Sequence, residues 1–372
     1  MLRARSSATP LALAYAALIL YASLYPFTGW RWPPGHELAS LLKLPWPAYF
    51  PRFDIYANLV GYMPLGLLAF AASVRRERRA WVAFLLGVAA GAGLSFVTEA
   101  TQNFLPERVP SLLDWLLNSG GVLLGAVLGV VLHVTGQLDR LQALRDRWFT
   151  GGSVGARVLL LLWPMALLFP SPVPLGLGQV AEPMRGLAAQ AVAATPYEPL
   201  LQPWLAERER PPGLTPLGEW WAITLGLLGP CLLAHSALRP GLRRLVVAAM
   251  LTATGFAATT LSVALSFGPQ HAFTWLTPAT LPGFAAGLIL ALATAWMGRR
   301  LSAALALVAI TALVALVAQA PADPYFSQSL AAWQQGRFIR FHGLAQWLGW
   351  LWPYAAVAWL LARFAARERN LG

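Results

Sequence analysis

The segment that decides the fold begins as RVPSLLDWLLN (residues 108–118) and continues as SGGVLLGAVLGVVL (residues 119–132). The second part is uncharged and, with its apolar flanks, provides the roughly 20 mostly apolar residues that a helix needs to cross a bilayer. Asp114 and Asn118 stand at the start of this helix. Shortly before, in GLSFVTEATQ (residues 93–102), Glu99 ends another apolar run. Acidic and amide side chains therefore lie at the ends of two helices that suit lipid.

The composition indicates the class of protein. Of 372 residues, 58% are hydrophobic and 11% are charged, and the mean hydropathy is +0.57. Soluble domains carry about 25% charged residues. We therefore predict an all-α, polytopic helical membrane protein whose main partner is the lipid bilayer. The net charge of +12 could suggest nucleic acid, but no basic helix or aromatic platform for RNA is present, so we expect no nucleic-acid partner.

Hydropathy predicts about ten transmembrane helices, with the first read as an uncleaved span rather than a cleaved signal peptide. The ranges are 9–25, 57–74, 80–98, 113–134, 155–170, 219–238, 243–265, 280–298, 300–319 and 343–364. With both termini in the cytoplasm, 18 of the 27 basic residues fall in the inside segments, as the positive-inside rule expects. We divide the chain into a four-helix region, residues 1–137, and a six-helix region of unassigned role, residues 138–372.

The outside segments differ from the short basic inside loops. Residues 26–56 are rich in Trp and Pro, and HELASLLKL (residues 36–44) predicts a short helix that lies on the membrane. Residues 171–218 form the longest predicted loop. Lys43 is the only lysine, which is typical of a GC-rich coding sequence and favours a bacterial source, hence the bacterial cytoplasmic (inner) membrane.

Three acid–amide pairs mark the predicted outer ends of the second, third and fourth spans. Spacing of four residues places both members of a pair on one helix face. Ser111 also begins a capping box, which explains Asp114 as a structural residue. Capping does not explain Glu99, because the helix dipole disfavours an acid at a helix C-terminus. A structural polar lock and a functional site both remain open, and Arg108 lies in the short loop that can reach either acid. The pairs are Asp54 with Asn58, Glu99 with Asn103, and Asp114 with Asn118.

The ordered set of these residues resembles the VanZ-like membrane family over roughly residues 10–135. The matching pattern is Asp54-x-x-x-Asn58 with Pro64-Leu-Gly66, then Ser95-x-x-x-Glu99-x-x-Gln102, then Arg108-x-x-Ser111-x-x-Asp114-x-x-x-Asn118-x-x-Gly121-x-x-x-Gly125. The resemblance implies an envelope protein of a family tied to glycopeptide (teicoplanin) susceptibility, and it brings no mechanism or catalytic residues. As family-pattern positions, it marks an outer polar cluster of Asp54, Asn58, Glu99, Gln102, Arg108, Ser111, Asp114 and Asn118.

Three further features of the sequence are candidate sites or contact surfaces. A glycine row on the fourth span favours close packing within the chain over homodimerisation; its members are Gly121, Gly125 and Gly129. Oxygen ligands of Asp54, Glu99 and Asp114 could hold a hard cation, but the scattered histidines argue against zinc, and we expect no metal or cofactor. A second outward cluster, of Arg337, Arg340 and His342, suits either phosphate binding or anchoring of the last span.

Three functions compete. The favoured one is a non-catalytic module that binds a lipid-linked or glycan ligand, or an envelope-synthesis protein, at its outer face. The second is an enzyme acting on a phosphate-bearing lipid or glycan, with an acid of the outer polar cluster as acid or base and Arg108 stabilising negative charge. The third is a flippase for such a lipid. Against it, the sequence places no charged residue deep inside a span, where ion relays usually lie.

Overall fold

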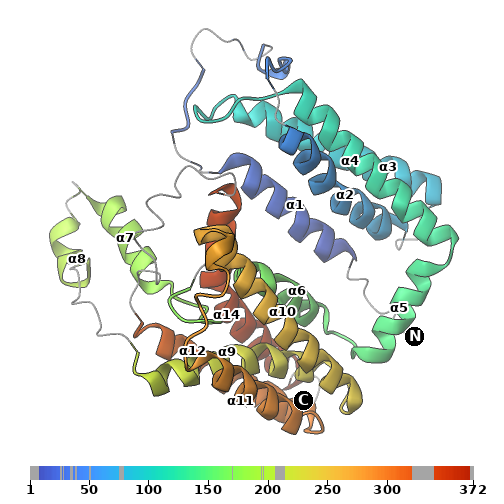
Figure 1. The fold of residues 1–372 in the computed structure, drawn as a ribbon. Coiled ribbons are helices and arrows are strands. Elements are labelled where there is room, and N and C mark those ends of the chain that lie inside the picture. Colours follow the sequence, from blue (N-terminus) through green and yellow to red (C-terminus); the bar gives the residue numbers. More distant parts are fainter. Residues whose placement is uncertain are drawn as a thin grey trace. The chain divides into compact units, whose positions relative to one another are not determined.

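A computed structural model gives an all-helical architecture, with thirteen α-helices and no β-strand in the described part of the chain (Figure 1). The residues described are 8–25, 27, 29–33, 37, 40–49, 52–74, 79–169, 171–193, 195, 197–205, 214–320 and 339–368. The chain divides into two compact units, residues 1–147 and residues 148–372. Each unit is described by itself.

The first unit is a bundle in which α2, α3 and α4 pack on one another and α1 packs on α2 and α3. Its helices are α1 (Ala8–Leu24), α2 (Arg52–Val74), α3 (Ala80–Gln102), α4 (Leu112–Val134) and, at the end of the unit, α5 (Gln137–Trp148). Ser111 caps α4, because its side chain accepts a hydrogen bond from the backbone N–H of Asp114. The capping box read from the sequence therefore sets the start of α4.

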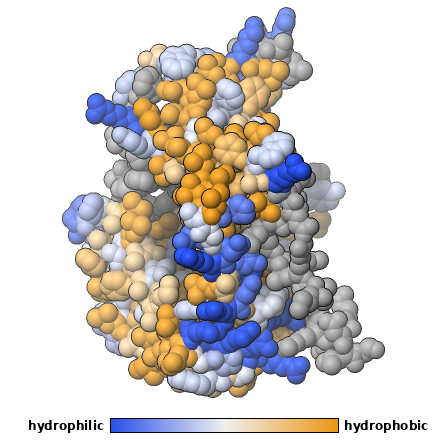
Figure 2. Space-filling view, turned by 90° about the vertical axis from the view of Figure 1, so that its right-hand side faces the viewer, coloured by the Kyte–Doolittle hydropathy of each residue, from blue (hydrophilic) through white to orange (hydrophobic). Residues whose placement is uncertain are grey.

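Helix α4 buries its small residues and exposes its large ones. Gly121, Gly125, Ala126 and Gly129 are buried. The exposed side of the helix carries large aliphatic residues, namely Leu123, Leu124, Val127, Leu128 and Val131. Such a face would be unfavourable in water and suits lipid tails, where helices associate through close contact of small residues. Orange, hydrophobic residues likewise cover broad areas of the face drawn in Figure 2.

The buried glycine row of α4 lies against the backbone of α2. A Cβ added at Gly121 would clash with the carbonyl oxygen of Leu59, and one added at Gly125 would clash with that of Met63. From the opposite side, a Cβ on Gly66 of α2 would clash with the carbonyl oxygen of Val122. The prediction of packing within the chain is confirmed, and the row is not free to serve a homodimer.

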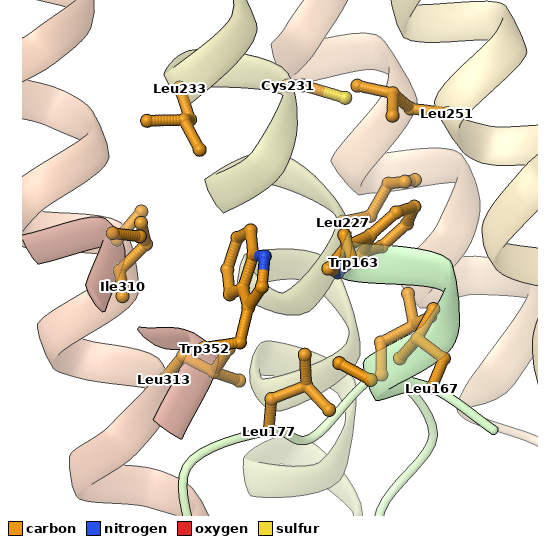
Figure 3. Close-up of a cluster of buried hydrophobic side chains, with 14 of the residues drawn as sticks. Trp163, Leu167, Leu177, Leu227, Cys231, Leu233, Leu251, Ile310, Leu313 and Trp352 are labelled. Carbon is orange, nitrogen blue, oxygen red and sulfur yellow. The ribbon is translucent and has the colours of Figure 1, made fainter. Parts of the chain in front are cut away.

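The second unit is built around one buried helix. Its helices are α6 (Val154–Ala166), α7 (Ala181–Val192), α8 (Glu198–Leu205), α9 (Pro216–Ala237), α10 (Leu242–Phe267), α11 (Thr280–Ala293), α12 (Arg299–Val317) and α14 (Ile339–Glu368). Fourteen of the 22 residues of α9 are buried, which places it at the centre, in contact with α6, α10, α11 and α12. Leu227 and Leu233 of α9 pack with Ile310 of α12, Trp163 of α6 and Trp352 of α14 (Figure 3).

A non-helical segment, residues 172–178, is buried in this second core. Non-helical backbone inside a membrane domain must find its hydrogen bonds within the protein. Pro353 has no N–H, so the carbonyl of Gly349 loses its usual partner in α14. The N–H of Gly178 donates to that carbonyl at 2.9 Å, and the Tyr354 hydroxyl donates to the carbonyl of Gly178 at 3.1 Å. Pro353 thus leaves the carbonyl of Gly349 available to accept the hydrogen bond that holds residues 172–178.

Each of the ten predicted spans is occupied by a helix, and the class of polytopic helical membrane protein is confirmed. Among the described residues six helices, α2, α3, α4, α9, α10 and α12, are long and apolar enough to cross a membrane, while α1, α6 and α11 are apolar but shorter. The number of crossings and their orientation stay predictions. Two predicted ranges end too late: α6 stops at Ala166, before the buried segment, and α11 stops at Ala293, where a turn begins.

Sequence reasoning missed three helices, and it predicted an interfacial helix where the described residues show a 3₁₀ turn. Residues 137–148 form α5 where an inside loop was expected, and α7 and α8 lie within the predicted loop 171–218. All three helices are short and contain both polar and apolar residues, so a search for long apolar segments does not detect them. In the region of the expected interfacial helix, residues 36–44, the described part shows only a 3₁₀ turn, Ser40–Leu42.

Candidate functional site

The ends of α2, α3 and α4 meet in a layer of polar side chains. The Asn58 side chain donates from Nδ2 to Oδ1 of Asp114 at 2.8 Å, which joins α2 to α4. The backbone N–H of Ser111 donates to Oε2 of Glu99 at 3.0 Å, which joins α4 to α3. Ser111 Oγ in turn accepts from the N–H of Asp114 at 3.2 Å. These four residues, Asn58, Glu99, Ser111 and Asp114, form what we call the outer layer.

A second layer lies one helical turn further along each helix. Asn118 follows Asp114 by four residues, Ser95 precedes Glu99 by four, and Tyr62 follows Asn58 by four. Asn118 donates from Nδ2 to Oγ of Ser95 at 3.0 Å, and all three side chains are buried. We call Tyr62, Ser95 and Asn118 the inner layer. Each of the three helices therefore contributes one polar residue to each layer, and Ser111, the N-cap of α4, is an additional member of the outer layer.

Arg108 and Gln102 hold the C-terminal end of α1. The Arg108 guanidinium donates to the carbonyl oxygens of Tyr25, at 2.9 Å from Nε, and Ala22, at 3.0 Å. The Gln102 side chain donates to the carbonyl of Ser23 at 3.0 Å. The last carbonyls of a helix have no partner within it and carry partial negative charge, so an arginine stabilises them well. Both family-pattern residues thus secure α1 against the bundle.

Glu99 is the most enclosed acid of the cluster. Its side chain is 4% exposed, and its carboxyl group interacts electrostatically with both Asp114 and Arg108. A buried carboxylate is unfavourable unless hydrogen bonds or an opposite charge offset the loss of water. The N–H of Ser111 supplies one such bond. Glu99 and Asp114 interact electrostatically, and their carboxylate oxygens add hydrogen-bond acceptors to the outer layer.

Two groups of predicted residues lie elsewhere. Asp54, in the first turn of α2, has an exposed side chain and no hydrogen bond to the two layers among the described residues. The structure therefore places Asn58, but not Asp54, in the outer layer, and Asp54 lies exposed one helical turn nearer the start of α2. In the second outward cluster, Arg337 lies outside the described residues; Arg340 and His342 belong to α14, and their side chains are outside the description.

A tryptophan-rich segment packs beside the outer layer. The backbone N–H of Arg31 donates to the carbonyl of Phe104 at 3.0 Å, and that of Leu112 donates to the carbonyl of Pro45 at 2.9 Å. Trp32 makes an edge-on contact with the ring of Phe104. Three indoles of this segment remain exposed, those of Trp30, Trp32 and Trp46. The segment that carries these indoles is thus hydrogen-bonded to the loop after α3 and to the first residue of α4.

Two members of the inner layer were not predicted as site residues. Ser95 stands four residues before Glu99 within the family pattern, and that spacing was a usable signal. Tyr62 gave no such signal, because a tyrosine in an apolar helix usually marks the interface. Among the described residues no group of three or more His, Cys, Asp or Glu side chains is placed to hold a metal ion.

Comparison with known proteins finds a family match for the part of the chain that contains these two layers. Residues 10–133 match the family model VanZ/LLP1. This part of the chain is VanZ-like. The match covers about a third of the sequence and contains both layers as well as the contacts of Arg108 and Gln102. No curated protein and no solved structure matches the chain, so the second unit gains no assignment from similarity.

Proposed function

We propose that the VanZ-like unit is a non-catalytic binding module of a bacterial cytoplasmic membrane. Its two polar layers hold the sugar-bearing head group of a lipid-linked or envelope glycan at the outer face. The observation that carries this proposal is the joining of Asn58, Asp114, Glu99 and Ser111 from three helices. The segment that carries the exposed indoles is hydrogen-bonded to the same helix ends, at Phe104 and Leu112. Carboxylates and amides bind sugar hydroxyls, and indole faces stack on the apolar faces of sugar rings.

The layers are better suited to binding than to turnover. Glu99 accepts from the Ser111 N–H and Asp114 accepts from Asn58, so both carboxylates are held in place as acceptors. The guanidinium of Arg108, which a phosphate-transfer enzyme would direct at its substrate, instead donates to the carbonyls of Ala22 and Tyr25. A glycan head group needs fixed acceptors of this kind. The link of the family to teicoplanin susceptibility fits a ligand of cell-wall synthesis.

The proposal is tested with matched acid-to-amide variants of the full chain. Glu99→Gln and Asp114→Asn keep the shape of the side chain and remove its charge, and Asp54→Asn is the control because its exposed side chain lies apart from the layers. We expect both cluster variants to express and fold, to bind an undecaprenyl-linked disaccharide in nanodiscs at least tenfold more weakly, and to change glycopeptide susceptibility in a bacterial host. Asp54→Asn should match the wild type.

Three results would count against a binding module. Unchanged affinity and susceptibility in both cluster variants would leave the layers as a lock between helix ends. Conversion of the disaccharide lipid by the wild type, abolished by either variant, would show an enzyme. Transfer of the lipid between leaflets of a vesicle, lost in the same variants, would show a flippase.

A further inference from the structure

Two helices of the second unit begin with a pair of arginines. Arg243 and Arg244 belong to the first turn of α10, and Arg299 and Arg300 are the first two residues of α12. Neither of these first turns contains an acid, and neither does the loop that precedes it. The starts of both helices therefore concentrate positive charge that no acid nearby in the sequence offsets.

Hydrogen bonds hold the two helix starts together. Arg244 is fully buried, and its guanidinium donates to the carbonyls of Ala295 at 3.3 Å and Met297 at 2.7 Å, in the loop before α12. The backbone N–H of Gly241, just before α10, donates to the same carbonyl of Ala295 at 3.2 Å. The Arg244 guanidinium also interacts with that of Arg299 as a like charge. Arginines of α10 and α12 are thus fixed close to one another.

The described residues leave this positive charge without an acidic partner. Arg244, Arg299 and Arg300 form no ion pair with any described residue, and Nε of Arg244 is buried without a hydrogen bond there. Gly241 and Gly298 stand at the N-cap positions of α10 and α12, so no side chain caps either first turn. The N-terminus of a helix carries partial positive charge and attracts anions. A bound anion would therefore relieve both the repulsion among the arginines and the positive ends of two helices.

An exposed apolar surface begins directly beside these arginines. Leu301 follows Arg300, and Val308 lies seven residues further along on the same face of α12; both side chains are largely exposed. Trp296 in the preceding loop is also exposed, and tryptophan is typical of the level of lipid head groups. Helix α12 is long and apolar enough to cross a membrane. A ligand at this place meets positive charge at one end and apolar side chains at the other, which fits a phospholipid better than a soluble phosphate.

We propose that the starts of α10 and α12 bind the phosphate of an anionic phospholipid. Arg299 and Arg300 donate to the phosphate oxygens, because the planar guanidinium fits a phosphate with two parallel hydrogen bonds. Arg244 is a positioning residue that ties the two loops together, and the acyl chains lie along the exposed face of α12. Basic sites between membrane helices are known to hold anionic head groups in this way. The proposal concerns the second unit and does not depend on the function proposed for the first.

Lipid binding to the purified full chain tests the proposal. Delipidated protein in mild detergent is titrated with phosphatidylglycerol, which is anionic, and with phosphatidylcholine of the same acyl chains, which is not. Native mass spectrometry then counts the bound lipids. We expect the wild type to bind phosphatidylglycerol more tightly than phosphatidylcholine, and the preference to weaken as salt is added.

Matched variants separate a site from diffuse positive charge. Arg299→Gln combined with Arg300→Gln should weaken binding of phosphatidylglycerol by about 30-fold, from the usual contribution of two basic residues beside an anionic lipid. Arg300→Gln alone, at an exposed position, should weaken it by about fivefold, and this variant keeps the test valid if the double variant fails to fold. The control is Arg140→Gln combined with Arg147→Gln in α5, which removes the same charge from exposed positions and should leave the affinity unchanged.

Three results would overturn the proposal. Equal affinity of the wild type for the two lipids would show that the arginines hold no anionic head group. An equal loss of affinity in the α5 control would show that lipids respond to the overall charge of the protein and not to this site. Displacement of phosphatidylglycerol by an equal concentration of glycerol phosphate would identify a soluble phosphate, in place of a lipid, as the ligand.

Discussion

Replacing Gly125 by alanine tests the arrangement on which the polar layers depend. In the structure a Cβ at this position would clash with the carbonyl oxygen of Met63 and would stand 2.8 Å from the carbonyl carbon of the same residue. These are backbone atoms of α2, so no rotamer change can relieve the overlap. Helices α2 and α4 would have to move apart, along the face that also joins Asn58 to Asp114.

The magnitude follows from two opposing effects. Overpacking of a tight contact costs about 1–3 kcal/mol, and we take the upper end because the clash is with backbone. Alanine in place of glycine inside a helix returns about 1 kcal/mol of helix propensity. The expected net loss in the free energy of unfolding is about 2 kcal/mol. Gly93→Ala in α3 is the matched control, because a Cβ there meets nothing within 4 Å, and it should gain up to about 1 kcal/mol.

The measurement is equilibrium unfolding of both variants by SDS in mixed micelles, followed by circular dichroism. The two should differ by about 3 kcal/mol, with Gly125→Ala the less stable. Equal stability would refute the close approach of α2 and α4. A change in the fraction of dimer on crosslinking, without a change in monomer stability, would assign the glycine row to a homodimer after all.

Other predictions concern Arg244, Arg108 and the topology. Arg244 is fully buried and donates to three carbonyls that follow α9 and α11, those of Leu238, Ala295 and Met297. Arg244→Met should therefore lower the free energy of unfolding by at least about 2 kcal/mol in the same assay. Arg239→Met, at an exposed position, should leave it unchanged. Arg108→Lys keeps the charge and loses the planar fork, so hydrogen exchange at the last turn of α1 should accelerate, and unchanged exchange would refute the anchor. Reporter fusions should place residues 140–157 inside and residues 100–112 outside, and the reverse result would overturn the orientation.

The sequence predicted which polar residues gather at the helix ends. It did not predict which of them form hydrogen bonds with one another. Asp54 with Asn58, and Asp114 with Asn118, were expected as pairs along one helix, because four residues separate their members. In the structure Asn58 bonds to Asp114 and Asn118 bonds to Ser95, both across helices. Spacing gives the face of a helix, whereas the partner depends on how helices are rotated and at what depth they meet. A single sequence does not contain that information.

Backbone partners are a second limit of sequence reasoning. Arg108 was expected to reach Glu99 or Asp114, and it does interact electrostatically with Glu99. The described hydrogen bonds of the Arg108 guanidinium, however, go to the carbonyls of Ala22 and Tyr25 at the end of α1, some 80 residues earlier in the chain. Every residue has a carbonyl group, so nothing in residue identity marks those of Ala22 and Tyr25 as acceptors. The one usable signal is the end of an apolar helix at Leu24, where unpaired carbonyls always occur.

The second unit shows the limit of hydropathy. Its buried segment 172–178 has the Pro and Gly content of a surface loop and was predicted to be one. It is enclosed because other residues leave room and bonding sites for it: Gly226 of α9 lies against Leu175, and Pro353 frees the carbonyl of Gly349 for the N–H of Gly178. Each of these contacts joins residues far apart in the chain. Local composition therefore cannot distinguish this segment from an exposed loop.

The packing of the first unit and its polar layers depend on one another. Small residues let α2 and α4 approach until their backbones touch, as Gly66, Gly121 and Gly125 show. Only at that separation can the short side chain of Asn58 reach Asp114 directly at 2.8 Å. The same approach encloses Tyr62 and Asn118, which are both buried. The glycines and the polar residues of the VanZ-like pattern thus serve one arrangement, in which close helix contact lets polar side chains of three helices bond to one another.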